Sequence, residues 1–191
     1  MVRALLVMAV FSTVAVAADQ SYESAKYKID LIEEDRAAPS SRIWLSLAEL
    51  NAYAGIEAPK VVPQGLRNLR LELGQGSATG SALVDFLKVR ELGGPPPSRL
   101  IAWFLAGERP VRVTATIESG QGRATVTVRQ VTVSGMTAAG TVLDFLIANF
   151  LLPFYPQAKI GQPFDLKHGV DRLEVTPAGV RVFMAPKPPA R

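Results

Sequence analysis

The stretch that decides the fold is PVRVTATIESGQGRATVTVRQVTV, residues 110–133. On both sides of its centre, apolar and polar residues alternate with a period of two, which is typical of strands with one wet face. The glycine-rich centre, residues 119–122, predicts the turn of a β-hairpin. After Gln130 the alternation slips, because Val131 and Val133 are apolar in the opposite phase. A slip of one residue predicts a β-bulge, which bends and twists a sheet.

Further strands are expected on both sides of this hairpin. Residues 69–73 alternate leucine with charged residues, and a glycine turn leads into a second strand over residues 77–86. Residues 170–175 and 180–184 predict a closing hairpin. Small side chains on the second strand would leave room for something to lie against the sheet. Its expected inward set is Ala78, Gly80, Ala82, Val84 and Phe86.

The N-terminal half also contains a short helix signal. Residues 20–36 are predicted as an extended or partly helical lead-in, followed by a short strand over residues 42–45. Ser46 and Glu49 then form a capping-box pattern, in which each side chain can bond the backbone N–H of the other residue. We expect a helix of about two turns that ends at Gly55.

Two more apolar segments follow. Residues 93–98 predict a stiff glycine- and proline-rich loop, and residues 99–106 a short helix. Residues 137–152 are the longest helix candidate and are apolar on nearly all sides, so this helix is expected to be buried. Residues 186–191 are expected to form a disordered tail.

Residues 1–18 have the layout of a secretory signal peptide, with Arg3 near the start, a short apolar run and Ala15-Val16-Ala17 at its end. The run is too short for an ordinary membrane span. We predict export to the periplasm with cleavage after Ala17 or Ala18. A buried N-terminal helix and an uncleaved anchor remain alternatives.

Composition narrows the classes further. The chain has 191 residues, no cysteine and a formal net charge of +4. Without cysteine, thiolate metal sites and disulfides are excluded. Basic residues are interspersed with acids, so nucleic-acid binding is not supported, and a weak attraction to anionic headgroups is left open. We expect one domain over residues 42–185, preceded by the lead-in over residues 19–41.

No residue pattern indicates catalysis. His168 is the only histidine and lies in a polar turn, where a surface role is expected. The chain carries no HxH or HExxH spacing, so no metal site is predicted. Asp85 and Asp144 lie among apolar residues, and a buried acid can act in catalysis, but water-facing positions are the simpler interpretation. We predict that the protein is not an enzyme and has no cofactor and no catalytic residues.

The order of elements predicts an α+β fold with a curved antiparallel sheet and a long apolar helix against it, with short additional helices. Four stretches, residues 44–53, 69–85, 110–133 and 161–166, carry a resemblance that extends over about residues 40–185, which is most of the mature chain. In pattern and order they resemble the tubular lipid-binding (TULIP-like) proteins of bacterial envelopes, including the family of the mycobacterial periplasmic mannan-elongation factor. That resemblance implies a curved sheet wrapped around the long apolar helix, an apolar groove for lipid tails and no shared catalytic residues. The triple-proline loop and the segment around Trp103 depart from the pattern.

The expected function is lipid binding or shuttling between sheet and helix, with a phospholipid or polyprenyl ligand. Arg112, Arg123 and Arg129 are headgroup candidates, although strand arginines are more often only the wet face of a sheet. The apolar helix can equally be plain core. A non-enzymatic scaffold that binds a protein partner is the alternative function, and an enzyme acting on envelope glycans or lipids is a third. Oligomeric state is not predicted. The expected groove residues are Ala78, Gly80, Ala82, Val84, Trp103, Phe104, Phe145, Ile147, Phe150 and Phe154.

Overall fold

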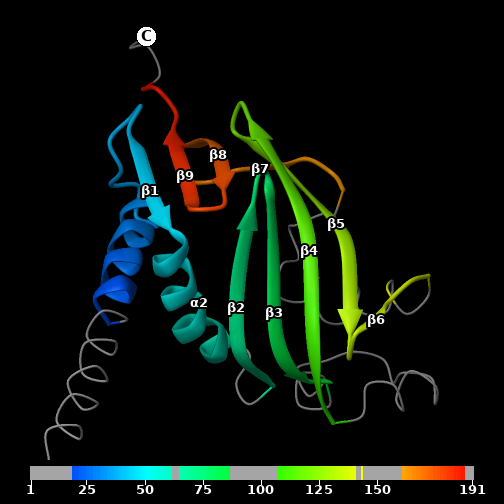
Figure 1. Ribbon diagram of the computed structural model, residues 1–191. Coiled ribbons are helices and arrows are strands. Elements are labelled where there is room, and N and C mark those ends of the chain that lie inside the picture. The colour runs from blue at the N-terminus through cyan, green and yellow to red at the C-terminus, as the bar shows by residue number, and fades with distance from the viewer. Residues whose placement is uncertain (1–18, 62–64, 87–106, 141–142, 144–160, 188–191) are drawn as a thin grey trace, which may run out of the picture.

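Two antiparallel sheets organise the chain in the computed structural model, which describes residues 19–61, 65–86, 107–140, 143 and 161–187 (Figure 1). The small sheet has the strand order β1-β9-β8, and the large sheet has the order β2-β3-β4-β5-β6, with β7 paired to β5. The predicted α+β class and antiparallel pairing are confirmed. The elements are β1 (Arg42–Ser46), α2 (Leu47–Val61), β2 (Leu66–Gly74), β3 (Ser77–Asp85), β4 (Glu108–Gly120), β5 (Arg123–Val133), β6 (Met136–Thr137), β7 (Phe164–Asp165), β8 (Val170–Thr176) and β9 (Gly179–Met184).

The β4–β5 hairpin forms as its alternation predicts. Its turn residues Gln121 and Gly122 have φ angles of 55° and 72°, the left-handed backbone of a two-residue turn that matches strand twist. Across the hairpin, Thr114 is opposite Gln130 but Ala115 is opposite Val128, so one residue on β5 is extra. The predicted bulge at this point is confirmed.

A second bulge lies in β2, where Arg67 is opposite Leu83 but Arg70 is opposite Ser81. Two residues of β2 therefore oppose one residue of β3, and one of them, Asn68, has a positive φ of 53°. This polar bulge breaks the leucine alternation, which is why the sequence predicts a strand start at Leu69 whereas β2 begins at Leu66.

The two sheets meet along β8. The hairpin turn of β2 and β3 donates from the Gly76 N–H to the Val175 carbonyl at 3.0 Å, and the turn of β4 and β5 donates from the Gly122 N–H to the Asp171 carbonyl at 2.8 Å. Between them, the Ser119 hydroxyl both donates to the Leu173 carbonyl and accepts from its N–H, each at 2.8 Å. These contacts satisfy the edge of β8 that β9 leaves open.

The lead-in is a helix over residues 19–33. It packs on the inner side of the small sheet, where Ala25 is fully buried beside Ile43, Leu45 and Val182. Because its apolar side chains join that core, the lead-in is fixed by tertiary packing that its mixed spacing does not reveal.

Helix α2 is longer than expected, and the predicted end at Gly55 is wrong. The helix continues through Gly55 and Pro59 to Val61. Gly55 keeps a negative φ, and glycine ends a helix mainly when its φ is positive. The Asn51 side chain also holds α2 along β2, because it accepts from the Leu71 N–H at 2.7 Å and donates to the Leu71 carbonyl at 3.0 Å.

The predicted helix start at Thr137 is wrong as well. Ser134 and Gly135 have φ angles of 52° and 80° and turn the chain back, so that Met136 and Thr137 pair with Val133 and Thr132. Leu143 is helical. The remainder of the expected long apolar helix, together with the predicted loop and helix over residues 93–106, lies outside the described residues.

Candidate functional site

The strand register assigns every residue of the large sheet to one of its two faces. Ala78 is opposite Leu73 and Ala115, and Gly80 is opposite Leu71 and Val113. Because side chains alternate across a strand, apolar positions align over four strands. We call this the apolar face; it comprises Leu71, Leu73, Ala78, Gly80, Ala82, Val84, Val111, Val113, Ala115, Ile117, Val126, Val128, Val131 and Val133.

The bulge on β5 keeps this face continuous. Without the extra residue, Val131 and Val133 would point to the opposite side, away from Val126 and Val128. With it, Val133 is opposite Val111 on β4 and is fully buried. The slip in the sequence is therefore what extends the apolar face along the whole of β5.

One end of the apolar face is buried and the rest is partly exposed. Val131 and Val133 form a core cluster with Phe86 and Ala138, and Leu143 packs against that cluster. Along β3, by contrast, the apolar face from Ala78 to Val84 is only partly buried. The apolar face therefore retains accessible hydrocarbon beyond the core that it contributes.

The side chains at the centre of the apolar face, around Gly80, are small. Among the residues that the structure describes, a Cβ placed on Gly80 would meet only Leu71 Cδ2, at 3.8 Å. Ala78 and Ala82 are its neighbours along the same side of β3. A chain-like ligand or a packed segment can therefore approach the backbone closely at this point.

The opposite side, which we call the polar face, is rich in threonine and charge. Thr79 and Thr114 share a hydrogen bond at 3.0 Å, and Arg112 pairs with Glu72. A shallow depression of the surface lies there beside Arg112, between Ser81 on β3 and Thr132 on β5. Hydroxyl and ion-pair partners make this side an ordinary wet face of the sheet.

The three headgroup candidates lie on the polar face. Arg112 sits between Val111 and Val113 in β4 and so points away from the apolar face. Arg129 donates from Nε to the Thr116 hydroxyl at 3.2 Å, and Arg123 is 3.3 Å from an oxygen of Asp165. The structure thus brings Ala78, Gly80, Ala82 and Val84 together and separates them from these arginines. The other expected groove residues, Trp103, Phe104, Phe145, Ile147, Phe150 and Phe154, lie outside the described residues.

A second chemical surface, which the sequence patterns do not predict, lies on the outer side of the small sheet. Its strands alternate buried aliphatic residues with outward arginine and aromatic residues, as in Arg42, Trp44, Arg181 and Phe183. We call this the arginine–aromatic face. The alternation was visible within each short strand, but only the pairing of three strands shows that these residues gather.

Glu49 is the one buried charged residue of the described part of the chain, and it is 8% exposed. Its carboxylate accepts from the Lys28 ammonium and the Ser24 hydroxyl at 2.5 Å each, and from the Ser46 N–H at 2.7 Å. Burial raises the pKa of Glu49, but these hydrogen bonds outweigh burial and hold the pKa at about 2. The predicted capping box is confirmed, since the Glu49 N–H donates to the Ser46 hydroxyl at 3.2 Å.

His168 occupies a turn with a φ of 56°, and its Nδ1 lies 3.3 Å from an Asp35 oxygen. A nucleophile is not among these contacts. In the described ranges, no group of three or more histidine, aspartate or glutamate side chains could hold a metal ion. Those ranges also contain no helix both long enough and apolar enough to cross a bilayer.

Comparison with models of known protein families, with curated proteins and with solved structures finds no match to this chain. The function is therefore inferred from the chemistry of the apolar face and of the arginine–aromatic face.

Proposed function

We propose that this protein binds lipid without catalysis, with hydrocarbon chains lying on the apolar face. One observation supports the proposal: four adjacent strands present a continuous apolar surface that is partly exposed. Its side chains are smallest around Gly80. Extended exposed apolar surface marks binding sites in proteins. An acyl or polyprenyl chain is the ligand class that such a surface fits.

The driving force is burial of methylene groups. Each buried CH₂ contributes about 0.8 kcal/mol, so ten of them contribute roughly 8 kcal/mol before the cost of immobilising the ligand. Binding of this size requires no polar anchor. The proposal assigns no headgroup role to Arg112, Arg123 or Arg129, because they lie on the polar face.

Native mass spectrometry of the purified protein, before and after organic extraction, tests the proposal. A phospholipid or polyprenyl adduct that extraction removes is expected. A variant with Ala82→Trp places a large ring on the apolar face and should lower lipid retention at least tenfold. The matched control Ser81→Trp places the same ring on the polar face of the same strand and should retain lipid. Equal retention in both variants, or an adduct-free mass for the unmodified protein, would count against the proposal.

Binding of a protein partner in the envelope is the second candidate. It is favoured by the outer edge of β5, because β6 pairs only with Thr132 and Val133, and β7 only with Arg123 and Ala124. Within the described ranges, no further strand lies beside the middle of β5, although the Gly161 N–H already donates to the Val126 carbonyl there at 2.9 Å. An extended peptide can add to such an edge. The variant Ala82→Trp should leave a partner bound at this edge in place, whereas it should lower lipid retention.

A further inference from the structure

Two rows of side chains cross the outer side of the small sheet. Arg42 on β1 is opposite Phe183 on β9, which is opposite Arg172 on β8. In the next row, Trp44 is opposite Arg181, which is opposite Glu174. The inner side of the same strands packs on the helix over residues 19–33 and on α2, so only the outer side is open.

The guanidinium groups stack on the rings. Arg172 Cζ lies 3.9 Å from the centroid of the Phe183 ring, Arg42 Cζ lies 5.5 Å from the same centroid, and Arg181 Cζ lies 5.4 Å from that of Trp44. In each pair the ring holds a planar guanidinium group by a cation–π contact, and the N–H groups of the guanidinium lie at the edge of the pair. The rings thus hold the arginines in a fixed layer.

The arginine–aromatic face has a net positive charge, because its three arginines outnumber the two acids that pair with them, Asp171 and Glu174. Arg172 pairs with Asp171 and Arg181 with Glu174, each at 3.0 Å. Arg42 forms no ion pair with any other residue that the structure describes. The side chains of Arg172 and Arg181 are 49% and 42% exposed, so their charges meet solvent.

Trp44 is held in place by Gly179. A Cβ at Gly179 would lie 2.8 Å from Trp44 Cζ2 and 2.2 Å from the Leu45 carbonyl oxygen. The indole therefore rests against the backbone of β9 at a point where no other residue would fit. The rings and cations of this face form a layer across three strands, and the depression beside Arg112 belongs to the large sheet.

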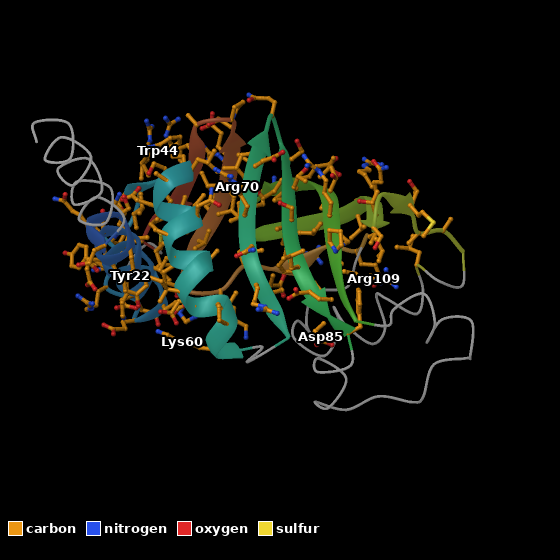
Figure 2. All side chains as sticks on the ribbon, turned by 60° about the horizontal axis from the view of Figure 1, so that its bottom comes forward. Tyr22, Trp44, Lys60, Arg70, Asp85 and Arg109 are labelled. Atoms are coloured by element: carbon orange, nitrogen blue, oxygen red, sulfur yellow. The ribbon has the colours of Figure 1, made fainter. Side chains whose placement is uncertain are left out.

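From this layer we propose that the arginine–aromatic face docks on an anionic phospholipid surface. Arginine pairs with phosphate through its planar N–H groups, and a partly exposed tryptophan suits the headgroup level of a bilayer. A cationic face that extends over three strands complements an extended anionic surface. Trp44 lies at the end of the molecule far from Asp85 and Arg109, so docking leaves that far end free (Figure 2). The proposal stands whether or not the apolar face binds lipid.

Co-sedimentation of the full chain with vesicles tests it. Vesicles of phosphatidylcholine containing about 30 mol% phosphatidylglycerol should bind the protein at about 0.05 M salt and release it at about 0.5 M. Pure phosphatidylcholine vesicles report binding by apolar segments such as residues 1–18. The triple variant Arg42→Gln, Arg172→Gln and Arg181→Gln should lower the anionic-vesicle affinity at least ~10-fold.

Two matched variants make the result specific. The triple variant Arg112→Gln, Arg123→Gln and Arg129→Gln removes the same formal charge from the polar face and should keep the affinity within about threefold. Replacing Arg42, Arg172 and Arg181 by lysine should keep most of the binding, and thermal melts should show all three variants folded.

Tryptophan emission supplies an independent readout. In the variant Trp103→Phe, Trp44 is the sole tryptophan, and its emission should shift to the blue with anionic vesicles only. Equal loss in both glutamine triples, an unshifted Trp44 emission, or binding to a soluble polyanion such as heparin without binding to vesicles would each overturn the proposal.

Discussion

Glu49 shows how one side chain joins three parts of the chain. Its carboxylate accepts hydrogen bonds from Ser24 and Lys28 of the N-terminal helix and from Ser46 at the end of β1. A buried carboxylate is costly unless several donors surround it, and here four hydrogen bonds do so. The same residue also completes the capping box of α2, so helix initiation and tertiary packing depend on one group.

The variant Glu49→Gln is therefore expected to lose on the order of 2–3 kcal/mol of unfolding free energy at pH 7. The folded-state pKa of about 2 lies below the ordinary value of 4.5, so folding favours the ionised form. This contribution is fully present above pH 4.5 and is lost as the pH falls towards 2. Urea unfolding at pH 7, 4 and 3 should show the difference between wild type and variant shrinking with acidity.

Glu34→Gln provides the control for Glu49, because Glu34 is exposed and pairs with the exposed Arg36. An exposed pair contributes about 0–1 kcal/mol, so this variant should resemble wild type at every pH. A constant difference between wild type and the Glu49 variant across the three pH values would contradict the assigned pKa.

At the scale of elements, segments with periodic hydrophobicity were predictable from the sequence, whereas the ends of helices were not. The β4–β5 hairpin, its bulge and the capping box all follow from local alternation and spacing. The end of α2 does not, because the part of the helix beyond Gly55 is bonded to a distant part of the chain, as when the Tyr22 hydroxyl donates to Glu57 at 2.6 Å. Tertiary contacts of this kind override the local preference of glycine and proline.

The variant Gly55→Ala tests the corrected length of α2. A Cβ at Gly55 would meet no atom of the described residues within 4 Å, and alanine in a helix interior is favoured over glycine by about 0.5–1 kcal/mol. The variant should therefore raise the unfolding free energy by that amount in urea titrations. If Gly55 were the left-handed terminus that the sequence indicates, alanine would instead destabilise the protein.

The candidate site was partly predictable for the same reason. Ala78, Gly80, Ala82 and Val84 share a face because they alternate along one strand, and parity alone also places Arg112 on the opposite side. The arginine–aromatic face was hidden, since β1 and β9 pair across more than 130 positions of sequence. Only the register shows that their outward residues form rows.

At the scale of the molecule, the two surfaces belong to different sheets that are joined along β8 (Figure 1). Three hydrogen-bonded positions make this joint: Gly76 with Val175, Gly122 with Asp171, and the two bonds of Ser119. The glycine positions bond through backbone, so substitution cannot remove those bonds selectively. At Ser119, by contrast, the hydrogen bonds between the sheets are made by a side chain.

The variant Ser119→Ala removes both hydrogen bonds to Leu173. The N–H and carbonyl of Leu173 then lack the Ser119 hydroxyl as their partner. An unfolding cost of about 1–3 kcal/mol is expected, with faster hydrogen exchange at the Leu173 amide. The matched variant Ser81→Ala loses only a 3.4 Å exposed contact with the Arg70 carbonyl and should stay within about 0.5 kcal/mol of wild type. If the sheets are held together mainly at β8, exchange should rise there while the β3–β4 ladder stays protected. A uniform rise over both sheets would mean instead that the molecule opens only as a whole, so that the joint is as stable as the sheets it connects.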